Sequence, residues 1–127
     1  MTILELKKLI IDDFVYSKKH HQIVRVWAVG PGYIQSYVGG LLTEIGNDDV
    51  DPIPLTPEIL ERNGFEKVQN LLVLQWENGV YPSMIFVEYN PKNYCLFIND
   101  MMFPKPVRFL HELHHILMDC GIEKEIK

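Results

Sequence analysis

Cysteine is scarce in this sequence, and long apolar runs are missing. The two cysteines, Cys95 and Cys120, are too few for the disulfide framework of a small secreted domain. No apolar run approaches the roughly 18 residues that a membrane-spanning helix requires. The opening stretch, MTILELKKLIIDDF, is broken by charges and has no small-residue cleavage site, so it does not match a signal peptide. We therefore expect a cytoplasmic protein with no membrane partner and with both thiols free.

Positive charge is also in short supply. The sequence has 12 lysines and arginines against 17 aspartates and glutamates, which gives a formal net charge of -5. Because nucleic-acid binders usually present a basic surface, this balance argues against a nucleic-acid partner. The sequence also lacks a Cys-x-x-Cys pair, a phosphate-binding glycine loop and a nucleophile elbow. Apart from the one motif described below, these absences predict that no cofactor is needed.

What the chain does have is the composition of an ordinary globular domain. Hydrophobic residues make up 47% and charged residues 23% of its 127 residues. No internal repeat, low-complexity tract or linker divides the sequence, and this length is typical of one domain. We therefore predict a single domain over residues 1–127.

Strand-forming stretches occupy much of the chain. They are rich in β-branched and aromatic residues, and they cover residues 22–29, 33–38, 68–76, 80–89 and 94–99. Turn residues such as Gly30-Pro31-Gly32 and Asn78-Gly79 separate neighbouring stretches and predict hairpins. The opening segment, residues 3–11, fits a short helix or a strand equally well.

Two helices are predicted by their end signals. Thr56 is suited to be an N-cap, Pro57 to the first helical position and Gly64 to the residue after the helix, so a short central helix is expected over 57–63. A longer C-terminal helix is expected over 107–120, with an apolar face against the sheet. The fold class is therefore α+β. In detail we expect a small curled antiparallel sheet, an SH3-like half-barrel of the N-terminal strands that the later three-stranded meander extends or closes.

The C-terminal helix carries one motif with chemical meaning, His-Glu-Leu-His-His at 111–115. It matches H-E-x-x-H, in which two histidines four residues apart share a helix face and hold one zinc ion. The motif assigns His111 and His115 as zinc ligands and Glu112 as the general base that acts on zinc-bound water.

A solvent-exposed polar helix face would show the same spacing. His111, Glu112 and His115 lie opposite the apolar face of the predicted helix, as ordinary surface residues would. Catalytic zinc usually has three protein ligands, and one straight helix cannot wrap three ligands around one ion. The third ligand would have to come from elsewhere, and nothing in the sequence brings the available candidates, His20, His21 and Asp100, near the motif. The sequence therefore favours a surface helix over a zinc site.

Two further groups of residues allow both a structural and a binding interpretation. Residues 17–21 form a small basic turn, which is either solvated or pairs with an anionic partner. The strand aromatics pack in the core or at an edge, or else form a surface that binds peptides; they are Trp27, Tyr33, Tyr37 and Trp76.

Two segments together carry a resemblance. They are PIPLTPEILERNGF at 52–65 and FLHELHHILMDCGIEKEI at 109–126. These segments resemble a group of short uncharacterised bacterial proteins, in places associated with phage or mobile elements, that combine a PIPLT-type turn with a VHELQ-type C-terminal helix. The resemblance implies kinship and no activity. Members of the group that lack the second histidine imply that a metal pair is not what this fold is built around.

Three functions follow as expectations. The first is a non-enzymatic interaction module that binds a protein or peptide, because no complete catalytic set is visible and small β-rich domains commonly recruit partners through exposed edges. The alternative is a zinc-dependent hydrolase that uses His111, Glu112 and His115. The third, a phage-type structural component, rests only on the setting of the resembling group.

Overall fold

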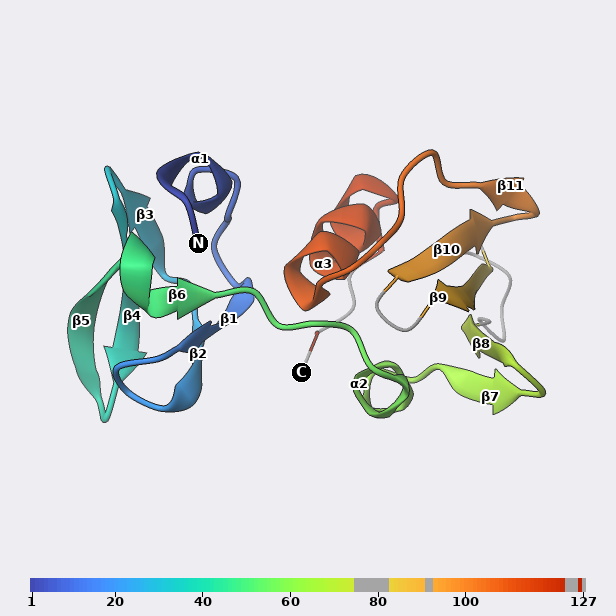
Figure 1. Cartoon of the computed structure of the whole chain (residues 1–127), viewed down its shortest axis with the longest axis horizontal. Helices are drawn as coiled ribbons and strands as arrows, with labels where there is room; N and C mark the ends of the chain where they lie inside the picture. Colours follow the sequence, from blue (N-terminus) through green and yellow to red (C-terminus); the bar gives the residue numbers. More distant parts are fainter. Residues whose placement is uncertain (75–82, 91–92, 123–125, 127) are drawn as a thin grey trace. The chain divides into compact units, whose positions relative to one another are not determined.

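The computed structural model describes residues 1–74, 83–90, 93–122 and 126, and these fall into two compact units (Figure 1). The N-terminal unit is Met1–Ile53 and the C-terminal unit is Pro54–Lys127. Helices and antiparallel sheets occur in both units, which confirms the α+β class, with sheet dominating. The prediction of one domain over 1–127 stays a prediction. Among the described residues, no helix combines the length and apolarity needed to cross a membrane.

The N-terminal unit holds two three-stranded antiparallel sheets and one short helix, α1. One sheet has the order β2-β1-β6, with bounds Gln22–Arg25, Phe14–Ser17 and Val50–Asp51. The other has the order β3-β4-β5, with bounds Ala28–Gly30, Tyr33–Val38 and Leu41–Gly46. A 3-10 helix, η1 (Asn47–Asp49), connects β5 to β6. The shared core consists of Leu6, Leu9, Val15, Val24, Val26, Ile34, Ile45 and Val50.

The ambiguous opening segment forms a helix, α1 (Ile3–Leu6). Thr2 and Glu5 decide this, because they form a capping box at the helix start. The Thr2 hydroxyl accepts from the Glu5 backbone N–H at 3.1 Å, and the Glu5 carboxylate accepts from the Thr2 N–H at 3.2 Å. Leu6 and Leu9 are then buried in the core of this unit.

The C-terminal unit contains a five-stranded antiparallel sheet of order β11-β10-β9-β8-β7. The strands are β7 Glu66–Val68, β8 Leu71–Leu74, β9 Met84–Asn90, β10 Asn93–Ile98 and β11 Met101–Met102. Figure 1 shows helix α3 (Leu110–Asp119) beside β9 and β10. The core face of the sheet carries the buried residues Leu72, Leu74, Met84, Phe86, Tyr94 and Leu96.

The sheets differ from the sequence prediction in three ways. The strand predicted over 22–29 is wrong as a single strand, because it forms β2 and β3, which belong to different sheets. The strand predicted over 68–76 is wrong as a single strand, because Gln69 adopts a positive φ of 56° and turns the chain between β7 and β8. The meander does not extend the N-terminal strands as predicted: its described strands β8, β9 and β10 pair with β7 and β11 in a separate, unclosed sheet. Strand β6 ends at Asp51, directly before Pro52, a residue that lacks the backbone N–H needed to continue a strand ladder. The predicted Asn78-Gly79 turn and Trp76 lie outside the described residues.

The central helix, α2 (Pro57–Arg62), confirms the helix predicted over 57–63 to within one residue. The Thr56 hydroxyl accepts from the backbone N–H of Ile59 at 3.2 Å, as an N-cap does. Asn63 is the C-cap, and Gly64 follows it with a φ of +94°, a conformation that glycine adopts without strain.

Replacing Thr56 with alanine should therefore lower the free energy of unfolding by about 1 kcal/mol, the usual value of a side-chain N-cap. Thr56→Ser keeps the hydroxyl and should retain most of the stability. Chemical denaturation of the two variants and the parent measures the difference. An unchanged midpoint for Thr56→Ala would show that the cap contributes nothing.

Helix α3 begins at Leu110, so the predicted start at residue 107 is wrong. Val107 instead pairs with Tyr94: each backbone N–H donates to the other residue's carbonyl, at 2.9 and 3.3 Å. Leu113 and Leu117, in the middle of the predicted apolar face, are buried as expected.

Candidate functional site

The three predicted site residues lie on the first two turns of α3, and their side chains are half-buried. The His111 ring stacks on Phe109, with centroids 5.8 Å apart and planes 9° apart. The His115 ring meets His111 edge-on at 5.7 Å. The Arg108 guanidinium also lies 5.0 Å from the Phe109 ring centroid. The two histidines therefore pack against aromatic rings on or next to their own helix, which contributes to their half-buried state.

Glu112 has a structural task at the start of the same helix. One carboxylate oxygen, Oε1, accepts from the backbone N–H groups of Arg108 at 2.9 Å and of Phe109 at 3.0 Å. The other oxygen lies 3.9 Å from the Arg108 guanidinium. This arrangement satisfies two N–H groups at the helix start. A general base must point at the water it activates, so Glu112 would have to leave this cap to act in hydrolysis.

The candidates for a third zinc ligand are placed in different parts of the chain. His20 and His21 lie in the β1–β2 turn of the N-terminal unit, and His20 Nδ1 is 2.9 Å from the Ser17 hydroxyl. Asp100 lies in the exposed β10–β11 turn of the C-terminal unit. Across the described ranges, no group of three or more His, Cys, Asp or Glu side chains is arranged to hold a metal ion. The metal roles of His111 and His115, and the catalytic role of Glu112, stay predictions.

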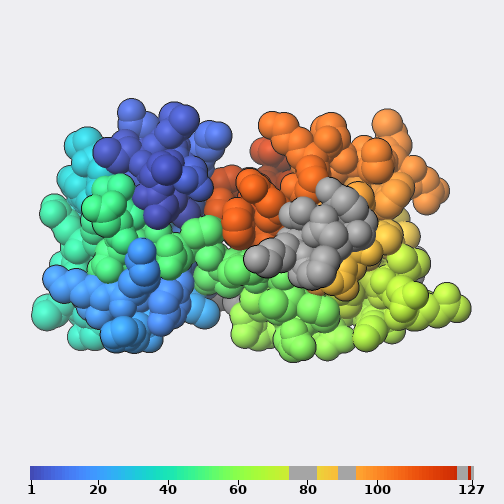
Figure 2. Space-filling model, in the orientation of Figure 1, coloured from blue at the N-terminus to red at the C-terminus, as the bar shows by residue number. Residues whose placement is uncertain are grey.

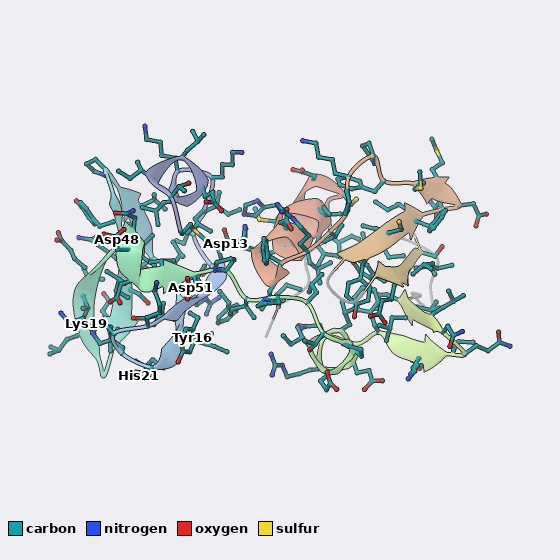
Figure 3. The ribbon with its side chains drawn as sticks, viewed as in Figure 1. Asp13, Tyr16, Lys19, His21, Asp48 and Asp51 are labelled. Atoms are coloured by element: carbon teal, nitrogen blue, oxygen red, sulfur yellow. The ribbon has the colours of Figure 1, made fainter. Side chains whose placement is uncertain are left out.

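The basic turn has acidic neighbours within its own unit. The Lys18 ammonium lies 3.7 Å from a carboxylate oxygen of Asp51, and the Lys19 backbone N–H donates to Asp49 at 2.9 Å. Figure 3 shows the labelled polar side chains spread over the unit, with His21 and Asp48 well apart. The basic turn is therefore partly neutralised, which weakens its suitability for an anionic partner.

Two titratable groups in the described part of the C-terminal unit have raised pKa values. Burial raises the pKa of the Tyr94 hydroxyl, and the carboxylates of Glu88 and Glu58 raise it further. Burial and the nearby Asp119 raise the pKa of the Cys120 thiol. A phenol and a thiol that hold their protons serve neither as bases nor as nucleophiles at neutral pH.

The face of the five-stranded sheet opposite its buried core is unusual in its chemistry. Cross-strand pairing arranges its side chains in two rows. The first row is Met102, Phe97, Ile85, Val73 and Glu66, and the second is Cys95, Val87, Leu71 and Val68. We call these nine residues the apolar outer face. A sheet with one solvated face normally carries polar residues there, whereas Glu66 is the only charged residue in these two rows.

Every side chain of the apolar outer face is at least partly exposed. Val68 is 50% exposed and Met102 63% exposed, and these two residues lie at opposite edges of the sheet. In Figure 2 the yellow-green atoms of β7 and β8 reach the surface at one end of the C-terminal unit. The other six apolar side chains of this face are half-buried. An apolar face that is partly exposed is a candidate for a surface that binds another molecule.

A hollow adjoins the β7 edge of this face. Its volume is about 190 Å³, and it is lined by Gly64, Glu66, Val68 and Val73. Three of these residues belong to the apolar outer face, and the fourth follows the C-cap of α2. Among the described residues, the hollow is therefore lined by two valines, a glycine and a glutamate.

A smaller aromatic surface lies on the β3-β4-β5 sheet of the N-terminal unit. Trp27 and Tyr37 are 52% and 57% exposed, and their rings meet edge-on at 5.8 Å. Leu42, 48% exposed, lies opposite Tyr37 on β5. Tyr33 instead covers Gly30, where an added Cβ would come within 2.3 Å of the tyrosine ring. Of the strand aromatics identified from the sequence, Trp27 and Tyr37 are therefore exposed as a pair.

Sequence reasoning missed the apolar outer face, although the sequence holds a signal for it. The segments LLVL at 71–74, MIFV at 84–87 and CLFI at 95–98 are apolar without interruption. A half-solvated antiparallel strand would alternate apolar and polar residues, whereas a continuous apolar run is typical of a strand covered on both faces. Three such runs in neighbouring strands indicate a second apolar face.

Comparison with known proteins adds no assignment. No protein family, no curated protein and no solved structure matches the chain. The resemblance to short phage-associated bacterial proteins stays a prediction.

Proposed function

We propose that this protein is a non-enzymatic interaction module that binds a protein or peptide partner. The observation that carries the proposal is the apolar outer face of the five-stranded sheet. Its eight apolar side chains span all five strands, from Val68 at one edge to Met102 at the other. A partner that covered them would remove this area from water, which favours association by about 25 cal/mol per Å² before the costs of binding.

The state of the cysteines supports a cytoplasmic setting for this function. Cys95 and Cys120 are both free thiols, and Cys95 lies within the apolar outer face. Free thiols persist in the reducing cytoplasm and are prone to oxidation outside it.

Site-specific crosslinking in cells that make the protein tests the proposal. Phe97, which lies next to Met102 in the first row, is replaced with the photo-crosslinking amino acid p-benzoylphenylalanine, and exposed Glu61 on α2 is replaced in the same way as a control. We expect one discrete crosslinked protein from position 97 and none from position 61.

Two further substitutions test whether the crosslink depends on the apolar outer face. Met102→Glu places a charge at an exposed edge position of the apolar outer face, while Tyr37→Glu places one on the exposed aromatic pair of the other unit. Met102→Glu should abolish the crosslink, and Tyr37→Glu should leave it unchanged. Equal crosslinking from positions 97 and 61, or a crosslink that survives Met102→Glu, would contradict the proposal.

The zinc-hydrolase alternative has its own measurement. Metal analysis of protein purified without a histidine tag should show less than stoichiometric zinc, because no third ligand accompanies His111 and His115 among the described residues. One zinc per chain, lost in a His111→Gln/His115→Gln double variant, would favour the hydrolase instead.

A further inference from the structure

The apolar outer face also has a shape and a charge that narrow the class of partner. Adjacent strands lie about 4.8 Å apart, so the rows of a five-stranded sheet run for about 19 Å. Residues two apart on a strand are separated by about 6.7 Å, so two rows with their side chains form a strip roughly 13 Å wide. The strip therefore covers on the order of 250 Å².

A second copy of this chain needs more area than this strip offers. Stable protein–protein interfaces bury about 800 Å² on each partner, roughly three times the area of the strip. One α-helix fits the strip much better, because a helix with its side chains is about 10–12 Å in diameter. At 1.5 Å per residue, a helix of about 13 residues spans the rows from β11 to β7.

The hollow beside β7 adds a charge requirement at one end of the strip. Its volume of about 190 Å³ gives room for one long side chain, and Glu66 is one of the residues that line it. Glu66 is exposed and is the only charged residue in the two rows. A lysine or arginine would match this site, since its methylene stem can lie on Val68 and Val73 while its charge meets Glu66.

From these features we infer that the apolar outer face docks one amphipathic helix of a partner protein. The helix is about 13 residues long, its apolar stripe covers the two rows, and a lysine or arginine in its last turn enters the hollow at Glu66. A cation in the last turn also lies favourably at the negative end of the helix dipole. The inference rests on the proposed function and specifies the partner of that same face.

A synthetic helical peptide tests the inference on the full-length protein. The probe has about 14 residues, with leucines at helical spacing, one lysine in its last turn, and a lactam bridge on its polar face that holds the helix. Fluorescence anisotropy should show saturable binding. Val68→Glu, at an exposed position of the face, should weaken binding by about tenfold or more, because a charge would be buried under the leucines. Tyr37→Glu, on the other unit, should leave binding unchanged.

The contact with Glu66 has a separate readout. Glu66→Gln should weaken binding of the lysine peptide by about two- to fivefold, the range for a partly exposed ion pair. It should not change binding of a peptide that carries glutamine in place of the lysine. Circular dichroism of the Glu66→Gln and Val68→Glu variants confirms that each is folded before its affinity is interpreted.

Three results would overturn the inference without contradicting the proposed function. Equal binding of a peptide with the same composition but alternating leucines would point to a strand rather than a helix. Absence of peptide binding, together with a specific crosslink from position 97, would show that the face binds a partner of another shape. Sedimentation of the protein as a dimer that Val68→Glu dissociates would also overturn it, in favour of a second copy.

Discussion

Phe86→Ala is expected to lower the free energy of unfolding by about 3–5 kcal/mol. Phe86 is fully buried in the core face of the five-stranded sheet. Its ring meets Phe65 edge-on at 5.2 Å and Tyr94 edge-on at 5.9 Å. Truncation would leave a cavity and remove both ring contacts, each worth about 0.5–1.5 kcal/mol beyond the buried area. A domain of this size has about 5–15 kcal/mol in total, so the loss is a large part of its stability.

Urea denaturation of the variant measures this loss, with Met102→Ala as the control. Met102 belongs to the same sheet but is 63% exposed, so its truncation should change stability by no more than about 0.5 kcal/mol. Phe86→Leu, which retains much of the side-chain volume, should fall between the two. A loss below about 1 kcal/mol for Phe86→Ala would mean that this core is not packed as described.

Ile34→Ala should cost about 2–5 kcal/mol in the other unit. Ile34 is the second residue of β4, is fully buried, and pairs across the sheet with buried Ile45. The surrounding core has few residues to collapse into the space, since it is built from one short helix and two small sheets. Leu41→Ala, at a position 73% exposed on β5, is the matched control and should be close to neutral.

Amide hydrogen exchange of the Ile34→Ala variant shows, residue by residue, which parts of the chain are destabilised. Exchange should accelerate in β4 and β5, where the hydrogen-bonded register runs from Tyr33 to Val38. The prediction of one domain over 1–127 requires equal acceleration in β9 and α3. Acceleration confined to residues 1–53 would show instead that the two units unfold separately.

Local signals in the sequence predicted local structure well. The central helix was predicted almost to the residue, because its start and end depend on Thr56, Pro57 and Gly64 within the segment itself. The start of α3 was placed three residues too early for the opposite reason. Val107 pairs with Tyr94, a residue far away in sequence, and such pairing overrides helix preference.

Prediction of the candidate site from the sequence is limited in the same way, because local signals do not show contacts in the folded chain. Helical spacing correctly places His111, Glu112 and His115 together on α3, but it cannot show that Glu112 turns back to cap the helix or that Phe109 stacks on His111. The apolar outer face is assembled from cross-strand neighbours on five strands, so its existence depends on strand register. The sequence shows the uninterrupted apolar runs, but it does not show the strand register that places them side by side.

The division of strand pairing between the two units has a consequence for synthesis on the ribosome. Every described strand of the first two sheets lies within residues 1–53, and β6, which completes the β2-β1-β6 sheet, ends at Asp51. Because chains emerge from the ribosome N-terminus first, these pairings become available before β7 has emerged. The apolar strands of the five-stranded sheet thus emerge after residues 1–53, whose strands already have their pairing partners. This order reduces the number of unpaired strand edges that are exposed at one time.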